Sequence, residues 1–245
     1  MSRLPILCYH NIGPAPPGRF GHLHLDEAKL DRQLWALRHL GLRGVSMTEG
    51  LALLRGDGRS NAVALTFDDG YLDTLTAALP VLKRYAFRAT CYLVSDCVGA
   101  HNRWDDDVGR DRQALMTRDQ VGEWLTAGME IASHSCTHPW LNRIDDDAAA
   151  HEIADSRAAL QRTFGVAIDH FGYPFGGITD RIVELVRRSG YASAVTTQRG
   201  IARASDDPLR LPRVLLRGDD GLGSFLVKVA TPFEDLANGR GLFGG

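Results

Sequence analysis

The chain has 245 residues, of which 44% are hydrophobic, and a formal net charge of −2 at pH 7. This composition is ordinary for a folded protein, and the length suits either one α/β barrel or two small domains. The near-neutral charge gives no indication of nucleic-acid binding, and no run approaches the roughly 20 apolar residues of a membrane span.

Short apolar runs alternate with longer amphipathic segments along the chain. In chain order, the predicted elements are the strand Pro5–Tyr9, the helix Asp26–Leu40, the strand Gly44–Ser46, the helix Thr48–Leu54, the strand Val63–Phe67, the helix Leu72–Tyr85, the strand Ala89–Val94, the helix Arg118–Ala127, the strand Met129–Ser133, the helix Asp145–Phe164, the strand His170–Tyr173, the helix Thr179–Ser189 and the strands Ala192–Thr196 and Leu211–Leu215. Asp26 is a plausible N-cap for its helix, which carries leucines near a 3.6-residue period.

This alternation predicts βα units and a mainly parallel sheet. Seven or eight units in about 230 residues suit a (β/α) barrel better than an open sheet. We expect one domain over residues 1–245, with a flexible Gly-rich tail at about 238–245.

The start of the chain bears on location. The apolar run Leu4–Cys8 is followed at once by Tyr9, His10 and Asn11. Because this run is shorter than the roughly 7–15 apolar residues of a secretion signal, we expect a cytoplasmic protein.

In a barrel the active site lies at the carboxyl ends of the strands. Metal-ligand and acid–base residue types gather after several of the predicted strands. They are His10, Asp68-Asp69, Ser95-Asp96, His134 with His138, and Phe175-Gly176.

Asp68 and Asp69 follow a buried strand, and Gly70 allows a sharp exit from it. Neighbouring side chains on an extended backbone point in different directions, so the two carboxylates can serve different roles. A divalent cation would relieve their mutual repulsion. The alternative is a simple hairpin turn, since Asp-Gly is a common turn dipeptide.

His134 and His138 stand at HxxxH spacing after another apolar strand, and Pro139 disfavours a helix there. Two imidazoles and one carboxylate form an open three-ligand set typical of catalytic zinc, and the same set suits iron or cobalt. A pair of surface histidines without metal is the alternative.

The four cysteines, Cys8, Cys91, Cys97 and Cys136, show no CxxC spacing. Three of them lie in or beside predicted strands, which indicates small reduced core residues rather than a disulfide framework. Cys136 lies between the two histidines, but Asp69 already completes a ligand set without it.

With these motifs, the chain resembles the polysaccharide deacetylase domain (NodB homology, carbohydrate esterase family 4) from roughly Pro5 to Arg217. The family motif TFDDG is present as Thr66–Gly70, and H-[ST]-x-x-H as His134–His138. The resemblance implies a distorted (β/α) barrel. It also implies Asp68 as catalytic base, and Asp69, His134 and His138 as ligands of a divalent metal, most simply zinc, with cobalt, nickel or iron as alternatives.

The third family motif, Arg-x-Pro-Tyr, departs here, because Gly172 stands at the arginine position. Phe175 follows the proline, and its backbone N–H would retain the oxyanion-binding role that the motif implies. Asp68 then lacks its usual orienting arginine. Arg213 is the candidate substitute, although an exposed surface arginine is an equal reading.

The C-terminal Leu-x-His motif, which supplies the general acid in many members, has no histidine here. His10 stands in a Tyr-His segment similar to that of the poly-N-acetylglucosamine deacetylase subgroup, in which an early histidine takes this role. A structural histidine bonded to a loop is the alternative. For sugar contacts the candidates are Tyr173 and Trp140, although Trp140 could equally be a core aromatic. The long polar loop Ser95–Met116 could shape the cleft.

The expected function is metal-dependent removal of N-acetyl groups from an N-acetylated sugar or polysaccharide, with release of acetate. A cyclic imide or ureide amidohydrolase, an O-acetyl esterase and an inactive carbohydrate-binding domain stay open as alternatives. The sequence does not define the oligomeric state.

Overall fold

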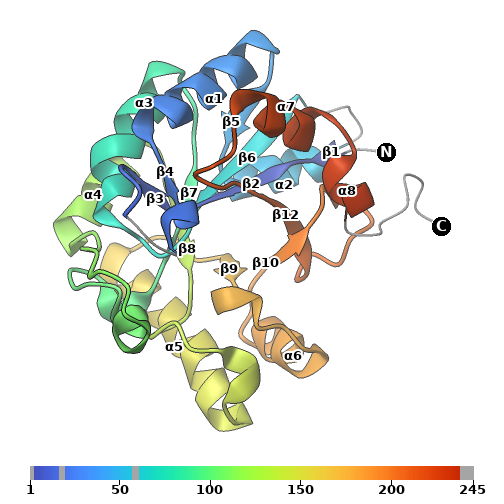
Figure 1. Ribbon diagram of the computed structural model, residues 1–245. Helices are drawn as coiled ribbons and strands as arrows, with labels where there is room; N and C mark the ends of the chain where they lie inside the picture. The colour runs from blue at the N-terminus through green and yellow to red at the C-terminus, as the bar shows by residue number, and fades with distance from the viewer. Residues whose placement is uncertain (1–2, 17–19, 57–60, 238–245) are drawn as a thin grey trace.

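The computed structural model describes residues 3–16, 20–56 and 61–237, so the predicted tail at 238–245 lies outside the described residues. Parallel strands gather at the centre of the molecule, and helices surround them (Figure 1). The barrel strands are β2 (Ile6–Tyr9), β6 (Ala62–Phe67), β7 (Thr90–Leu93), β8 (Glu130–Ser133), β9 (His170–Gly172), β10 (Ser193–Arg199) and β12 (Leu211–Leu215).

These strands form the order β2-β12-β10-β9-β8-β7-β6, and β2 also pairs with β6, which closes the ring. Every pairing within the ring is parallel. The predicted (β/α) barrel is therefore confirmed as a closed seven-stranded barrel.

The predicted strand Gly44–Ser46 lies outside that ring. It is β5 (Arg43–Val45), which pairs with the first half of β6 from Arg43↔Ala62 to Val45↔Ala64. Further along β6, Thr66 pairs with Thr90 of β7 instead. Of the eight predicted strands, Gly44–Ser46 is thus the one that extends the sheet beside β6 and does not belong to the barrel ring.

Most predicted helices are confirmed to within a residue or two at each end. They are α1 (Glu27–His39), α2 (Met47–Arg55), α4 (Arg118–Thr126), α5 (Asp146–Phe164) and α6 (Asp180–Arg188). The side chain of Asp26 accepts a hydrogen bond from the Ala28 N–H, which confirms the predicted N-cap.

The predicted helix Leu72–Tyr85 is wrong as a single α-helix. It consists of a π-helical segment, Thr74–Ala78, followed by α3 (Leu79–Arg84). Pro80 has no N–H to donate to the preceding turn, and such a gap in the helical ladder favours the wider π turn.

Several elements were not predicted. They are α7 (Leu222–Ala230), α8 (Phe233–Ala237) and the short strands β1 (Arg3–Leu4), β3 (Asn11–Ile12), β4 (His24–Leu25) and β11 (Ala202–Arg203). The acidic residues Glu234 and Asp235 of α8 are buried and pair with Arg199 and Arg203. Among the described residues, no helix is both long and apolar enough to cross a membrane.

The barrel interior changes from apolar to polar along its axis. Ile6, Ala64, Ala132 and Leu211 share a buried cluster with residues of α2, which closes the amino end of the barrel. Side chains two positions apart on a strand point the same way. Continuing by two or four residues along these strands therefore brings Cys8, His10, Asp68, His134 and Arg213 to the interior of the carboxyl end.

Candidate active site

Asp68 and Arg213 form a buried ion pair at the carboxyl end of the barrel. Arg213 of β12 donates to both carboxylate oxygens of Asp68, at 2.8 Å to Oδ1 and 2.7 Å to Oδ2. The arginine side chain is only 1% exposed, so the reading of Arg213 as a surface residue is wrong. Burial alone would raise the pKa of Asp68, but the guanidinium outweighs burial and lowers it to about 2. The carboxylate is therefore ionised at any ordinary pH.

Asp69, His134 and His138 converge beside this pair. Asp69 Oδ1 lies 3.5 Å from His134 Nε2 and 3.3 Å from His138 Nε2, and all three side chains are buried. Within the described part of the chain, this oxygen accepts no hydrogen bond. A buried carboxylate oxygen facing two imidazole nitrogens is a donor set suited to a divalent cation.

The backbone explains why the two aspartates diverge. Asp69 has φ 75° and Gly70 has φ 78°, so the chain leaves β6 through two left-handed residues. A Cβ on Gly70 would lie 2.8 Å from Leu93 Cδ2. The segment then enters a helix, so Asp69-Gly70 is not the hairpin turn that the dipeptide alone allowed.

His134 is oriented by the backbone of β9. Its Nδ1 lies 2.8 Å from the carbonyl oxygen of Gly172, which leaves Nε2 to face Asp69. A Cβ at Gly172 would lie only 2.7 Å from His134 Nδ1 and 3.1 Å from Tyr92 Cδ1. In this chain, the ring of His134 therefore fills the space that a side chain at position 172 would occupy. The guanidinium that contacts Asp68 comes from Arg213 of β12 instead.

Glu152 of α5 holds the loop that carries the two histidines. One carboxylate oxygen accepts the backbone N–H groups of Cys136 and Thr137, both at 2.9 Å, and the other accepts the Thr137 hydroxyl at 2.6 Å. Ser135 and His138 in this loop have φ of 67° and 65°, which is uncommon for side chains with a Cβ. The sequence prediction missed Glu152, because nothing in the chain marks its alignment with this loop.

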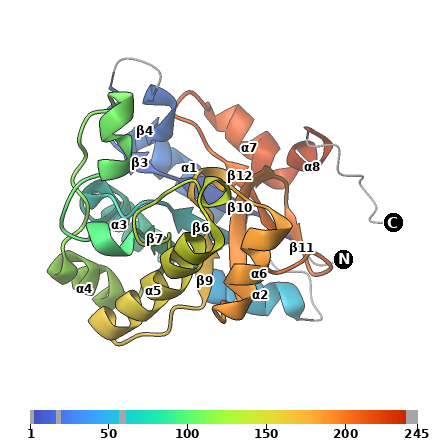
Figure 2. The same ribbon diagram turned by 90° about the horizontal axis from the view of Figure 1, so that it is seen from below.

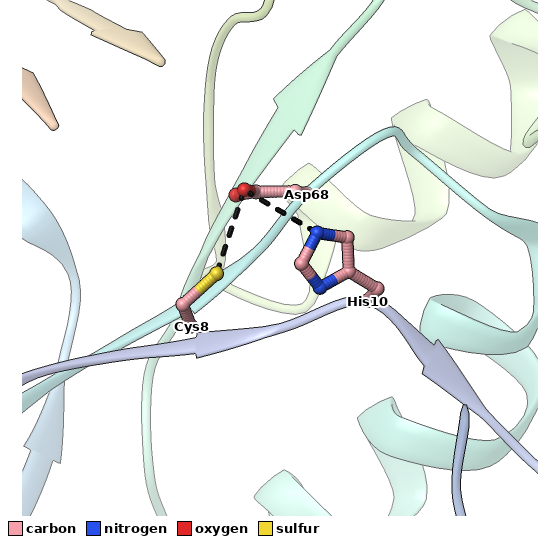
Figure 3. A group of neighbouring side chains, drawn as sticks. All are labelled: Cys8, His10 and Asp68. Atoms are coloured by element: carbon pink, nitrogen blue, oxygen red, sulfur yellow. Dashed lines mark hydrogen bonds and ion pairs between the residues drawn. The ribbon is translucent and has the colours of Figure 1, made fainter. Parts of the chain in front are cut away.

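His10 directly follows β2 and reaches the same carboxylate. Its Nε2 lies 4.0 Å from Asp68 Oδ2, and the thiol of Cys8 donates to that oxygen at 3.5 Å (Figure 3). Burial lowers the pKa of His10, and the charges of Asp68 and Asp69 offset part of that effect. The imidazole of His10 is thus mainly neutral near pH 7.

The predicted aromatic residues lie at different depths. Trp140 and Phe175 stack with ring centroids 4.8 Å apart and are 37% and 38% exposed. The ring of Phe175 also lies 4.4 Å from that of His138. Tyr173 borders the cavity but is buried, and its hydroxyl donates to the Leu209 carbonyl at 2.9 Å. Its hydroxyl is therefore engaged in a structural hydrogen bond, and its contact with a sugar stays a prediction.

A cavity of about 220 Å³ joins these groups. The loop at 95–116 and the segment after β2 form much of its rim and lie side by side (Figure 2). Arg110 connects them, because it donates to Asp105 at 2.9 Å and to Asn11 at 2.6 Å. The expectation that the long loop shapes the cleft thus has a structural basis in this buried contact.

The cysteines are all free thiols, and Cys136 does not belong to the Asp69 cluster. Its sulfur instead lies 3.9 Å from the carbonyl oxygen of His151. Cys8 was not singled out as part of the site. Its position two residues before His10, at the end of a predicted strand, was the signal that could have identified it.

Comparisons of sequence and of structure both find similarity to deacetylases. The sequence model of the family described as Polysaccharide deacetylase matches residues 55–194. The deacetylase PplD of Streptococcus pyogenes, solved in complex with acetate, is 27% identical, with a TM-score of 0.80 over 93% of this chain and 98% of that chain.

Two curated relatives extend this similarity. YxkH of Bacillus subtilis (strain 168) is 27% identical over 87% of this chain and 71% of that protein. The poly-β-1,6-N-acetyl-D-glucosamine N-deacetylase of Escherichia coli (strain K12) is 26% identical over 93% of this chain. This chain corresponds to 38% of the length of the Escherichia coli protein.

Proposed function

The chain belongs to the polysaccharide deacetylase family, and from this premise we propose that it hydrolyses the N-acetyl group of an N-acetylated sugar or glycan and releases acetate. The observation that carries the proposal is that one cavity contains two carboxylates with different partners. Asp68 is held by a guanidinium, and Asp69 faces two imidazoles. A base beside a cation site supplies the proton acceptor and the Lewis acid that metal-assisted amide hydrolysis by water uses.

The residues around Asp69 fit a divalent metal. Its buried Oδ1 accepts no hydrogen bond from the described residues, and both neighbouring imidazole nitrogens face it. We propose zinc, with cobalt, nickel or iron as alternatives for the same donor set. A cation bound there would supply Lewis acidity toward the acetyl carbonyl and would lower the pKa of water toward about 7.

Asp68 is our proposed general base. Its pKa near 2 keeps it ionised, and two hydrogen bonds from Arg213 fix the plane of its carboxylate. A base held in one orientation can accept the proton of an attacking water without reorganising. Arg213 is accordingly a positioning residue in this proposal.

His10 is our proposed general acid for the departing amine, because an amide nitrogen leaves readily only when it is protonated. Its Nε2 lies 4.0 Å from Asp68 Oδ2, and the two residues follow the neighbouring strands β2 and β6. Burial favours the neutral imidazole, so His10 must gain a proton before it can donate one. The Phe175 backbone N–H is proposed as an oxyanion donor.

A glycan suits the exposed aromatic residues better than a small cyclic imide. Trp140 and Phe175 form a partly exposed stacked pair that leads outward from His138. Sugar rings pack on such surfaces, whereas a small imide needs an enclosed pocket. An inactive binding domain would not need the Asp68–Arg213 pair beside the cation site.

The test is acetate release from chitooligosaccharides and from oligomers of β-1,6-linked N-acetylglucosamine. We expect no release by metal-stripped protein and release after reloading with Zn²⁺, Co²⁺ or Ni²⁺. Asp68→Asn should lower kcat by at least about 100-fold while metal content stays the same. Full activity of that variant would eliminate Asp68 as the base, and no release with any metal despite bound metal would reject the deacetylase proposal.

A further inference from the structure

A second group of metal-ligand types lies directly beside the first. The sulfur of Cys8 is 3.5 Å from Asp68 Oδ2, and His10 Nε2 is 4.0 Å from the same oxygen. The sulfur, nitrogen and oxygen atoms all lie within 4.8 Å of one another (Figure 3). Cys8 and His10 are two residues apart at the end of β2, so both point toward Asp68.

We propose that Cys8, His10 and Asp68 form a second, weaker site for a thiophilic divalent cation such as Zn²⁺, and that occupancy of this site inhibits the enzyme. The binding part of the proposal needs only the three side chains. The inhibition part rests on the proposed function, in which Asp68 is the base and His10 the acid.

The donor set suits zinc or cobalt. Thiolate, imidazole and carboxylate are all zinc ligands, with metal–ligand distances of about 2.0–2.3 Å. Ligand atoms around such an ion lie on the order of 3.2–3.7 Å apart in tetrahedral geometry. The observed separations from Asp68 Oδ2 are 3.5 and 4.0 Å, and all three atoms lie within 4.8 Å of one another, so the His10 ring must move inward to complete the geometry.

The ion has a route and a counter-charge. His10 and Asp68 line the same cavity as Asp69, so a cation can arrive from that side. Each carboxylate oxygen offers about two acceptor positions, so the hydrogen bonds from Arg213 leave lone pairs of Asp68 available to a cation. When Cys8 binds as a thiolate, its proton passes to solvent. The negative charges of the thiolate, Asp68 and Asp69 then balance part of the positive charge.

The second site is weaker because binding there must displace existing interactions. Cys8 has a proton and donates it to Asp68, and Arg213 already occupies that carboxylate. At Asp69 the free oxygen faces two nitrogens without competition from a guanidinium. We therefore expect the Asp69 site to fill first and the Cys8 site to fill only when metal is in excess.

The experiment is a Co²⁺ titration of metal-stripped protein, followed by near-ultraviolet absorption and acetate release on the same samples. The first equivalent should give cobalt bands without a sulfur-to-cobalt charge-transfer band. The second should add that band and reduce acetate release. Zn²⁺ in excess should inhibit the Zn²⁺-loaded protein in the same way.

Cys8→Ser is the test variant, and Cys136→Ser, in the loop between the two histidines, is the matched control. Cys8→Ser should lose the charge-transfer band and need at least tenfold more metal for the same fractional inhibition. Cys136→Ser should keep both. Circular dichroism and first-equivalent cobalt binding verify that each variant is folded.

Three results would overturn the proposal: no charge-transfer band at excess cobalt, a band that persists in Cys8→Ser, or a band that disappears in Cys136→Ser. If the band follows Cys8 but no acetate is released at any loading, the second site stands and the proposed deacetylase function fails. If acetate is released normally at the first equivalent and the band never appears, only the second site fails.

Discussion

Asp68 is a buried carboxylate whose charge depends mainly on one arginine. Its environment by itself favours the protonated form, and Arg213 reverses that preference through two hydrogen bonds. Removing one partner of such a buried pair leaves the other charge uncompensated, which typically costs about 3–5 kcal/mol.

We therefore expect Arg213→Met to lower the free energy of urea unfolding by a few kcal/mol, on the order of that penalty. The pKa of Asp68 should rise in the variant, because Arg213 is the main influence that opposes burial. A base works only when ionised, so the acid limb of the pH–activity profile should move to higher pH. The exposed Arg210→Met is the control and should leave the profile unchanged. An unaltered acid limb in Arg213→Met would contradict the orienting role of Arg213.

Gly172 determines how closely β9 approaches the first histidine. An added Cβ would lie 2.7 Å from His134 Nδ1, so the ring must move. Interactions that orient metal ligands typically contribute 10–100-fold to affinity. Gly172→Ala should weaken metal binding by about tenfold or more in competition with a chelator.

Gly122→Ala is the matched control for Gly172→Ala. Gly122 lies in α4, and an added Cβ there meets no atom within 4 Å. We expect unchanged metal affinity and slightly higher stability, since alanine favours a helix over glycine by about 1 kcal/mol. Equal metal affinity in both variants would mean that His134 adjusts freely.

At the scale of elements, α5 acts on the site through one side chain. Glu152 accepts hydrogen bonds from two backbone N–H groups and one hydroxyl of the loop that carries His138. Two residues of that loop have positive φ, so the loop has an intrinsic tendency to relax. The helix thus keeps the second histidine in place.

Glu152→Ala should therefore reduce metal affinity by about tenfold while the barrel stays folded. Isothermal titration with Zn²⁺ measures the affinity, and circular dichroism measures the fold. Glu184→Ala on α6, which loses only exposed pairs with Arg187 and Arg188, is the control. If both variants bind zinc as tightly as the unmodified protein, the loop holds its shape without Glu152.

At the scale of the whole molecule, a polar cluster joins several elements at the amino end of the barrel. Glu130 of β8 accepts hydrogen bonds from the hydroxyls of Thr48 and Thr90, and its carboxylate lies 3.7 Å from His170. It also accepts the Met47 N–H at 3.0 Å, at the start of α2. One carboxylate therefore connects α2, β7, β8 and β9.

This cluster predicts a specific acid sensitivity. Burial would raise the pKa of Glu130, but its partners, with His170 first, lower it from 4.5 to about 2. Because the folded pKa lies below the unfolded one, Glu130 stabilises the fold above about pH 4.5 and loses this contribution as pH falls toward 2. The contribution is on the order of 3 kcal/mol.

Glu130→Gln should therefore be less stable than the unmodified protein at pH 7, and the difference should shrink as the pH falls from 5 toward 3. Urea unfolding across this range measures it. A constant difference at all pH values would show that packing, and not the charge of Glu130, is responsible.

The sequence alone was sufficient for the class of fold, most element positions and the two principal motifs. Alternating apolar runs and amphipathic segments reflect local backbone geometry, and a buried strand ending in Asp68-Asp69 can be read from neighbouring residues. The resemblance to the family also provided His10, through its Tyr-His segment, and Arg213, as the substitute for the arginine absent at Gly172.

Only the tertiary structure decided which of these residues meet. Ring closure through β2 and β6 brings Cys8, His10 and Asp68 together from positions about 60 residues apart. The tertiary structure also showed that Arg213 is the buried partner of Asp68 and that Glu152 holds the loop of the two histidines. It further showed that β5 lies outside the ring. These outcomes depend on barrel register and on packing between distant segments, and local sequence patterns contain no information about either.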